Sequence, residues 1–483
     1  MNVYDIIIVG AGPAALAFAQ CCSFLNKKIL IIEKESSIGG CHRVRRVPVK
    51  YNNETEYVFT EHGPRVYSSS YINFIYLLKT IGVDFYDIFT PYNFSIINIG
   101  NQTVWNTLKF KELGQLAISF FKMIFDKNYG KDISVKQFAN KYNFNKMSID
   151  ILDKICRLTD GATSDNYTLY QFLQVFNQQF RHTLYQPKLP NDIGLFKTWK
   201  EKLESKDVTF LLNTYVNKLV IKDSKIESII TSDNKIYLGK QVILAIPPVN
   251  LTELLASSNI NDAWGDMDLL KAWSINTKYL DYISTTFHWD TRIDLPKVYG
   301  FPKSEWGIAF IVLTDYMNFK ETISKTVIST AITITDVKSK SGKLPNECSQ
   351  TELLQEIYNQ LKDSFPLLPE PSASVLSPAI VYDNNTKKWI SQDTAFISTT
   401  NQPFMNSQSQ IYKNLYTLGT HNGYHDRLMN FTSMESAVIN GISLSHLMYP
   451  DLKTKYTIYK NKHITDLLFI SFIIVCLIVL YYL

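Results

Sequence analysis

The sequence has few of the features that mark secreted or nucleic-acid-binding proteins. Its six cysteines form no Cys-x-x-Cys pair and have no regular spacing, which indicates free thiols in a reducing compartment rather than a disulfide framework. A net charge of +5 is small for 483 residues and is partly local to the C-terminus, so no nucleic-acid partner is predicted. Asp5 and a glycine turn interrupt any apolar stretch at the N-terminus, so no signal peptide is expected. The length favours two or three domains.

The N-terminus carries a nucleotide-binding pattern. An apolar, β-branched run at residues 6–9 is too short for a helix and predicts a buried parallel strand. Gly10 allows the tight turn that follows, Gly12 lets the backbone approach a pyrophosphate, and Ala15 permits close packing of helix on strand. The helix predicted for about residues 14–25 directs its free N–H groups and its positive dipole end at the phosphates.

The next segment extends this pattern. A second strand, residues 29–32, ends at Glu33, roughly 20 residues past the glycines, where a carboxylate can accept from a ribose 2′-hydroxyl. Gly39 and Gly40, with the cationic Arg43 close behind, can bring further N–H groups and positive charge to a diphosphate. The context of strand, turn, helix, strand and acid predicts a dinucleotide site; an ordinary glycine turn is the alternative.

A third segment is expected to form a wall of the same site. A short strand predicted at residues 57–60 leads into the sequence Glu-His-Gly-Pro-Arg at residues 61–65. His62 stands in a Gly-Pro turn beside Arg65, which favours a place in the site over a purely structural role.

These segments resemble the flavin-containing amine oxidase superfamily. The resemblance is carried by GAGPAAL at residues 10–16, IIEKESSIGG at 31–40 and EHGPR at 61–65. The superfamily includes monoamine and polyamine oxidases, protoporphyrinogen oxidase, phytoene-desaturase-like enzymes and, more distantly, UDP-galactopyranose mutase. It implies an α/β fold: a Rossmann-like FAD-binding domain with an inserted α+β substrate domain.

The resemblance also implies which residues bind FAD. Glu33 would hold the adenosine ribose, Arg43 would approach the pyrophosphate, and the backbone of Val216 would meet the adenine. The full set of expected cofactor-binding residues is Gly10, Gly12, Pro13, Ala14, Glu33, Lys34, Gly39, Gly40, Arg43, Gly63, Pro64, Arg65, Val216, Gly419, Thr420, Ser433 and Met434.

Three positions depart from the family pattern. Cys41 stands where an arginine often follows the two glycines, Thr420 replaces an acid, and Ser436 replaces a glycine. A strand at about residues 415–418 and a helix that starts near Ser433, capped by Thr432 or Ser433, are still predicted. This block has no cysteine, so non-covalent FAD is expected.

The middle of the chain is expected to form the substrate domain. Its first part is mainly helical, as at residues 113–124 and 148–158, and its later part alternates as antiparallel strands at 282–289, 307–313 and 327–335, followed by a helix at 350–361. The aromatic residues of the helical part are expected in the core: Phe120, Phe121, Tyr167, Tyr170, Phe172, Phe176 and Phe180. The predicted division is FAD domain 1–76, 206–250 and 411–450; substrate domain 77–205 and 251–410; basic linker 451–466; and tail 467–483.

The tail, residues 467–483, is an uncharged apolar run. Its length is near the lower limit for a membrane-spanning helix, and lysines precede it while Tyr481 and Tyr482 end it. This order predicts a single-pass C-terminal anchor with the catalytic body facing the cytosol; a buried C-terminal helix is the alternative.

The sequence therefore predicts a membrane-anchored FAD-dependent oxidoreductase. A small substrate with a C–H bond beside nitrogen, or another activated C–H, would transfer a hydride to flavin N5, and O₂ or another acceptor would reoxidise the flavin. A desaturase, a protoporphyrinogen-oxidase-like enzyme, a nucleotide-sugar mutase and an inactive flavoprotein scaffold are the alternatives. No catalytic base is predicted, since Lys278 is read as a solvated strand residue. No metal site is predicted, because His421 and His425 have no third ligand near them.

Overall fold

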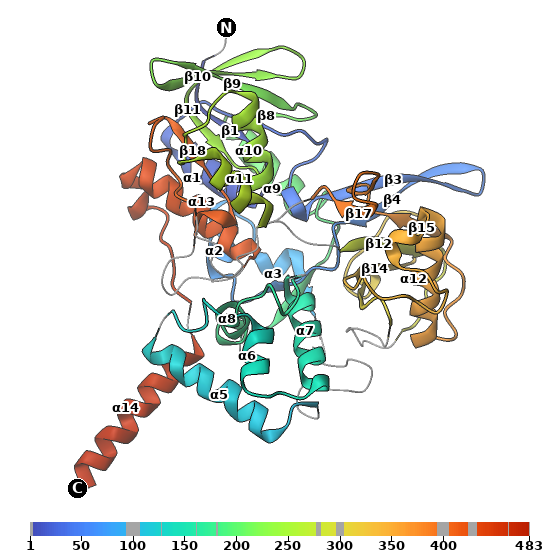
Figure 1. The fold of residues 1–483 in the computed structure, drawn as a ribbon. Helices are drawn as coiled ribbons and strands as arrows, with labels where there is room; N and C mark the ends of the chain where they lie inside the picture. Colours follow the sequence, from blue (N-terminus) through green and yellow to red (C-terminus); the bar gives the residue numbers. More distant parts are fainter. Residues whose placement is uncertain are drawn as a thin grey trace.

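The computed structural model describes residues 3–92, 107–126, 128–160, 162–179, 182–276, 282–295, 304–393, 405–423, 432–461 and 463–482. Figure 1 shows a large sheet with helices at one end of the molecule, a second sheet beside it, a group of helices below, and a last helix that projects from the body.

The largest sheet has seven strands, and the nucleotide-binding pattern supplies two of them. β1 pairs in parallel with β2 on one side and with β11 on the other. β8 extends the parallel part beyond β2, β18 pairs in parallel with the end of β11, and β10 and β9 add antiparallel strands. The strands are β1 (Val3–Val9), β2 (Ile29–Ile32), β8 (Val208–Leu211), β9 (Val216–Lys222), β10 (Lys225–Thr231), β11 (Ile236–Leu244) and β18 (Leu415–Thr417). The prediction of a buried parallel strand at residues 6–9 is thus confirmed.

Helices cover both faces of this sheet because successive side chains of β1 point to opposite sides. Ile6 and Ile8 belong to a core built with α1 (Pro13–Cys22), α2 (Ile72–Thr80), α9 (Leu195–Glu204) and α13 (Met434–Met448). Ile7 and Val9 face α10 (Pro248–Ser257) and α11 (Met267–Asn276). The first helix is shorter than predicted, since a 3₁₀ turn, η1 (Ser23–Leu25), follows α1.

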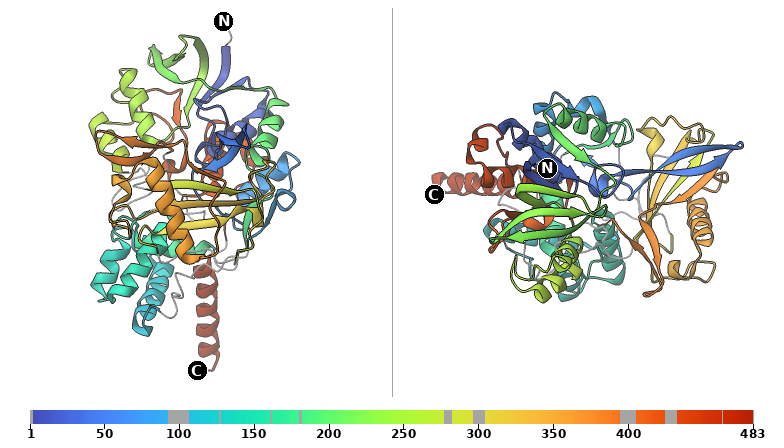
Figure 2. Two further views of the ribbon diagram at one scale, coloured as in Figure 1. Left: turned by 90° about the vertical axis from the view of Figure 1, so that its right-hand side faces the viewer. Right: turned by 90° about the horizontal axis from the view of Figure 1, so that it is seen from above.

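The second sheet is antiparallel, with the order β13-β14-β12-β15, and the long β3–β4 hairpin connects it to the first. Figure 2, seen from above, shows this hairpin reaching across to the second sheet, where Thr60 on β4 lies 3.1 Å from Thr286 on β12. The predicted antiparallel strands and the following helix are confirmed within a few residues. The elements are β3 (Val44–Tyr51), β4 (Glu54–Glu61), β12 (Ile283–Trp289), β13 (Ile308–Val312), β14 (Thr326–Ile332), α12 (Gln350–Ser364), β15 (Ala373–Leu376), β16 (Ile380–Asp383) and β17 (Lys388–Ser391).

The helical group has a core of its own. It consists of α5 (Phe110–Phe125), α6 (Val135–Lys141), α7 (Lys146–Asp160) and α8 (Leu169–Gln179). Tyr167 and Phe172 are buried there, as predicted. The prediction is wrong for Phe121 and Phe176, which are exposed, because helical spacing alone did not show which face of each helix is covered. Phe180 lies outside the described residues.

Short elements complete the fold. A three-stranded sheet of β5 (Tyr67–Ser68), β7 (Leu184–Pro187) and β6 (Phe89–Pro91) connects the helical group to the seven-stranded sheet. The other short elements are α3 (Phe85–Ile88), η2 (Gly40–His42), η3 (Leu313–Asp315), η4 (Pro345–Glu347), η5 (Thr420–Asn422) and η6 (Pro450–Thr454).

The last helix, α14 (Ile464–Tyr482), begins three residues before the predicted apolar run and projects away from the body (Figures 1 and 2). Its first turns pack against α5 and α8. Among the described residues, no helix is long and apolar enough to cross a membrane. The side chains of residues 475–483, the second half of the predicted anchor, lie outside that described set.

Candidate functional site

A cavity of about 800 Å³ lies where the large sheet, the second sheet and the helical group meet. One side is formed by the turn after β1 and by the start of α1, and the other by residues from β13, β14, α7 and α8. All of the predicted cofactor residues except Gly39 line it. Gly39 helps to fix the turn after β1, since its N–H donates to the carbonyl of Ala11 at 2.9 Å.

The turn after β1 needs glycines because the chain packs closely against itself there. Gly10 has a φ of +100°, and a Cβ on it would lie 2.3 Å from the carbonyl oxygen of Ala245, directly after β11. A Cβ on Gly40, which also has a positive φ, would lie 3.0 Å from the Cα of Gly12. Pro13 occupies the first turn of α1, where no N–H is needed. The turn and the N-terminus of α1 lie on the cavity, so the predicted pyrophosphate cradle, defined by Gly10, Gly12, Gly40 and the start of α1, stays a prediction.

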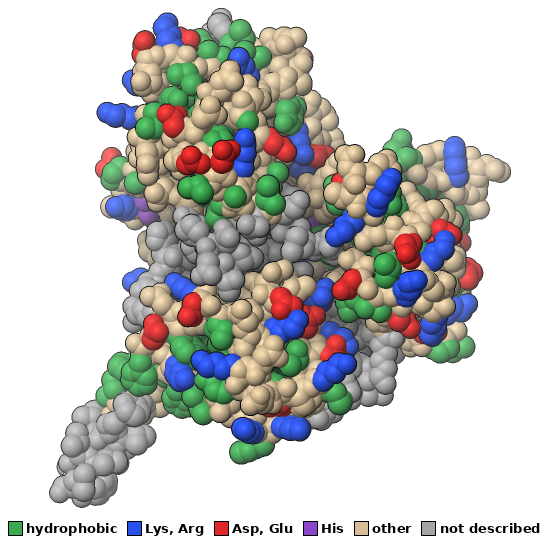
Figure 3. Space-filling model, in the orientation of Figure 1, with side chains coloured by type: hydrophobic (Ala, Val, Ile, Leu, Met, Phe, Trp, Pro, Cys, Tyr) green, Lys and Arg blue, Asp and Glu red, His purple; other side chains and the backbone are tan. Residues whose placement is uncertain are grey.

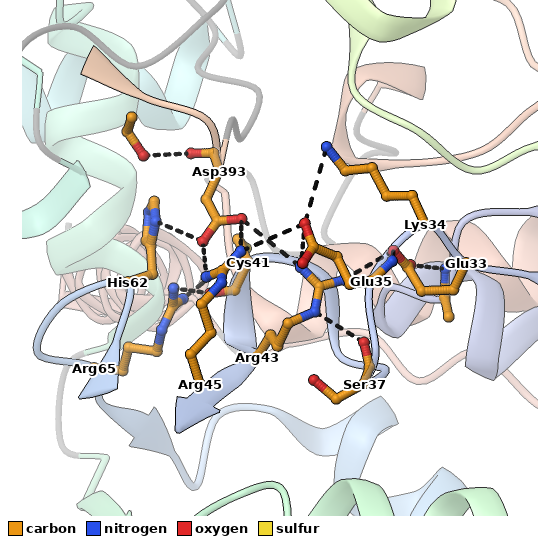
Figure 4. Close-up of polar contacts among 12 residues, drawn as sticks. Glu33, Lys34, Glu35, Ser37, Cys41, Arg43, Arg45, His62, Arg65 and Asp393 are labelled. Atoms are coloured by element: carbon orange, nitrogen blue, oxygen red, sulfur yellow. Dashed lines mark hydrogen bonds and ion pairs between the residues drawn. The ribbon is translucent and has the colours of Figure 1, made fainter. Parts of the chain in front are cut away.

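Glu33 is buried beside this cradle, and Figure 4 shows the polar contacts around it. Its Oε2 accepts from the backbone N–H of Ala11 at 2.9 Å. Its Oε1 accepts from the N–H of Glu35 at 3.1 Å and lies 3.0 Å from the Arg43 guanidinium. A carboxylate has about four lone-pair sites, so Oε2 retains one for a further donor such as a ribose hydroxyl.

The Arg43 guanidinium is directed at this acid and not at the glycine turn. Besides Glu33, it donates from Nε to the carbonyl of Ser37 at 2.8 Å, and it lies 3.8 Å from Asp393. The predicted contact of Arg43 with a pyrophosphate therefore stays a prediction, and it would require this guanidinium to exchange partners.

Arg65 supplies the positive charge nearest the second glycine turn. Its Nη2 donates to the carbonyl of Cys41, and its Nη1 lies 4.0 Å from the Cys41 sulfur. Its Nε is buried without a hydrogen-bond partner among the described residues. Cys41 stands where the family often has an arginine. In this chain the guanidinium of Arg65 brings a positive charge to that position.

Asp393, which follows β17, is joined to β3 at the cavity wall. It forms a bidentate ion pair with Arg45 on β3, with distances of 2.5 Å and 2.9 Å, and lies 3.8 Å from Nδ1 of His62. Burial acts to raise the pKa of Asp393, but the hydrogen bonds from Arg45 and the charges around it, including Arg45 and Arg43, together hold the pKa below its ordinary value. No sequence signal pointed to this residue, because it stands in a loop segment far from every motif.

Buried histidines in the wall are held neutral. Burial, assisted by the charge of Arg65, lowers the pKa of His62 to about 3 and that of His42 well below its ordinary value. His62 packs edge-to-face on Tyr282 with ring centroids 4.7 Å apart, and the Tyr282 hydroxyl donates to the His62 carbonyl. Next to them, burial raises the pKa of Glu61 to about 7, opposed by Arg65. His62 was predicted in the site from its Gly-Pro turn; Tyr282 was not.

The C-terminal block brings a helix N-terminus to the cavity. Ser433 is the N-cap of α13, as predicted, and its side chain accepts from the N–H of Ser436 at 3.1 Å. The preceding turn is fixed to the same helix, since Asn440 donates to the carbonyl of Gly419 at 2.7 Å. Thr420 lines the cavity between them. His425 and Lys278 lie outside the described residues.

The wall opposite the glycine turn is largely apolar and aromatic. Its members include Tyr92, Ile155, Phe176, Leu184, Tyr282, Phe310 and Ile311. Two polar side chains stand among them: Arg157, paired with Asp153 at 2.6 Å, and His182, whose pKa is lowered by burial. Such a pocket can enclose a small organic molecule and exclude water from it.

Comparisons with known proteins match this architecture. Residues 8–79 match the family described as NAD(P)-binding Rossmann-like domain. An oxidoreductase from Methanosarcina mazei has a TM-score of 0.63 at 12% identity, covering 92% of this chain and 99% of that chain. Putrescine oxidase bound to putrescine has a TM-score of 0.61 at 14% identity, and cyclohexylamine oxidase from Brevibacterium oxydans has 0.60 at 13%; each covers 93% of this chain and 99% of its own.

Part of the chain also matches a protein with a different activity. Over 79 residues the chain is 35% identical to UDP-galactopyranose mutase from Mycoplasma genitalium, and these residues are 16% of this chain and 18% of the mutase. The chain thus spans less than a fifth of that relative's length.

The chain has the fold of these oxidoreductases, with a Rossmann-like dinucleotide-binding domain at residues 8–79. Its structural neighbours include amine oxidases, so the resemblance predicted from the sequence is confirmed at the level of the fold.

Proposed function

We propose that this chain is an FAD-dependent oxidoreductase of the amine oxidase type that acts on a small organic substrate. The observation that carries the proposal is the cavity, which has the glycine turn and Glu33 on one side and an aromatic wall on the other. When bound, FAD supplies an acceptor for the hydride that leaves the substrate carbon.

The residues of the chain fit this cofactor. We propose that the turn at Gly10, Gly12 and Gly40 accommodates the pyrophosphate, because all three glycines line the cavity at the N-terminus of α1 and allow its backbone to approach a ligand. Glu33 would accept from the adenosine ribose through the remaining site on Oε2. The other expected contacts, including Val216, Thr420 and Met434, lie on the same cavity. Binding is proposed to be non-covalent.

On the opposite side, the chain would enclose and orient the substrate. The neutral imidazoles of His62 and His182 are hydrogen-bonding partners suited to an amine, and the aromatic wall excludes water from the reacting carbon. The two carboxylates of the described lining, Glu33 and Asp393, both face arginines.

We also propose the division into FAD and substrate domains that the sequence predicts.

The C-terminal anchor belongs to this proposal. The described side chains of α14 that are exposed are mostly apolar: Leu467, Phe469, Ile470, Ile473 and Ile474. The helix projects from the body, and lysines 453, 455 and 460 precede it. We propose that α14 inserts into a membrane and that the lysines and the catalytic body stay on the cytosolic side.

The deciding experiment is an absorbance spectrum of the purified protein, followed by anaerobic reduction with a panel of primary, secondary and polyamines. A flavin spectrum that bleaches with an amine, and release of H₂O₂ when air is admitted, are the expected results. Denaturation and filtration should then leave the polypeptide colourless. A protein without flavin, or yellow colour that stays with the denatured polypeptide, contradicts the corresponding part of the proposal.

Isomerisation of a nucleotide-sugar is the second candidate, favoured by the match to UDP-galactopyranose mutase over 79 residues. It predicts conversion of UDP-galactopyranose by the chemically reduced protein with no net consumption of reductant. Reduction by amines without such conversion would reject it.

A further inference from the structure

Helix α5 presents an apolar face to solvent that the fold does not use. Phe110, Ile118, Phe121 and Phe125 are exposed by 92%, 47%, 51% and 71%. They recur at intervals of eight, three and four residues, which places them on one side of a helix. The opposite side of α5, through Leu113, Leu116, Phe120 and Met123, packs into the core of the helical group. The helix is therefore apolar on both sides, and folding explains only the inner one.

The charges of α5 stand at the margin of this face. Lys111 and Lys122 are exposed. The one acid within α5, Glu112, is buried and turned inward, where it accepts from the N–H of Asn145 at 2.7 Å and from the Ser148 hydroxyl at 2.7 Å. An exposed apolar stripe with lysines beside it is the pattern of a helix that lies in the interface of an anionic membrane.

The position of α5 relative to α14 supports the same partner. The two helices pack against each other. Figure 1 shows α5 running across the base of α14 and not along it, and Figure 3 shows hydrophobic side chains gathered where α14 leaves the body. If α14 follows the membrane normal, a helix that crosses its base lies along the membrane surface.

We propose that α5 is a second membrane contact: its outer face, Phe110, Ile118, Phe121 and Phe125, inserts into the headgroup region of an anionic bilayer. The proposal rests on the proposed anchor for its orientation and adds to it a fixed distance between the catalytic body and the lipid. The occupant is a bilayer and not a second copy of the chain, because the lysines of two facing α5 helices would be brought together.

The test uses the full chain in vesicles of phosphatidylcholine and phosphatidylglycerol, with and without bromine on the acyl chains. Phe125→Trp, and independently Phe121→Trp, adds one reporter to the seven tryptophans present. The matched control is Leu367→Trp, at a side chain 96% exposed after α12 on another part of the body. The added emission of the α5 variants should shift to the blue with vesicles and fall at least twofold with brominated lipid, and that of the control should not.

Each of the remaining results of the vesicle experiment contradicts the proposal in a different way. If the protein floats with vesicles but the added emission of both α5 variants is not quenched, α5 is not a membrane contact and the anchor stands. If the protein does not float, the anchor is overturned, and α5 with it. A blue shift that depends on protein concentration and needs no vesicles identifies a second copy as the partner and overturns the proposal.

Discussion

Arg45 and Asp393 are 348 positions apart in the sequence and form a bidentate ion pair at the wall of the cavity. Both side chains are largely buried, with 12% and 8% exposed. The pair fixes the segment after β17 to β3, and so it holds the end of the two-stranded β16–β17 sheet against the β3–β4 hairpin.

Removal of this acid should be costly. Asp393→Asn removes the bidentate partner of Arg45 and leaves only Glu35, 3.7 Å from its Nη2, to oppose the charge. Removing one partner of a buried pair costs about 3–5 kcal/mol. Urea unfolding of the variant should show a loss of that order. The control is Asp165→Asn, whose partner Lys136 lies 2.8 Å away but whose carboxylate is 59% exposed; there a loss under about 1 kcal/mol is expected. Equal losses in the two variants would contradict this role of Asp393.

Glu33 should matter for the cofactor. Glu33→Ala removes the proposed acceptor for the ribose hydroxyl, and loss of a charged hydrogen-bond partner costs about 1–3 kcal/mol. FAD titration should therefore show an affinity roughly 5- to 150-fold weaker. Glu35→Ala, two residues further along and partly exposed, is the control and should retain its affinity. An unchanged affinity of the Glu33 variant would reject the assignment.

Glu61 should make stability depend on pH. Burial raises its pKa in the folded state from 4.5 to about 7. Between these values the unfolded chain has lost the proton and the folded chain keeps it, so the free energy of unfolding falls as pH rises through this window, by about 3 kcal/mol in all. In Glu61→Gln the side chain does not titrate, so this contribution to the pH dependence of the free energy of unfolding is absent.

The comparison is made by urea unfolding at pH 5, 6, 7 and 8. The Glu61→Gln variant should gain stability relative to the wild type up to about pH 7 and then run parallel to it. Glu54→Gln, at the exposed start of the same strand β4, serves as the control. A difference between Glu61→Gln and wild type that is constant with pH would contradict the prediction.

Gly441 should be intolerant of a side chain. A Cβ there would lie 2.6 Å from the Ala14 carbonyl and 2.8 Å from the Ala17 side chain, so Gly441→Ala must push α13 away from α1. A loss of about 1–3 kcal/mol is expected from overpacking. Gly114→Ala is the matched control in helix α5, where a Cβ meets nothing within 4 Å. That change should stabilise by up to about 1 kcal/mol, because alanine favours a helix. Calorimetry compares both with the wild type.

Local signals predicted the parts of the site that follow each other in the chain. Gly10, Gly12 and Glu33 lie within one strand–helix–strand unit, so their spacing alone fixes where they meet. Ser433 was found as an N-cap because capping is also a local rule.

The remainder depended on contacts between distant segments. The residues next to Asp393 in the sequence do not show that it pairs with Arg45. In the same way, the hydrogen bond from Arg65 to Cys41 depends on how the Gly-Pro turn packs in the fold. The exposed Phe121 shows the same limit, since its helical period is that of its buried neighbours and only the neighbouring elements decide which face is covered.

The order of the strands has a consequence for biosynthesis. β1 lies between β2 and β11, and β11 begins at Ile236. At a synthesis rate of about 5–20 residues per second, the edge of β1 that pairs with β11 stays unpaired for roughly 10–50 s. The helix N-terminus that completes the cavity, at Met434, comes later still. The nascent chain therefore displays an apolar, unpaired strand edge until β11 has been made, and the cavity stays incomplete until Met434 and the helix that follows have been added.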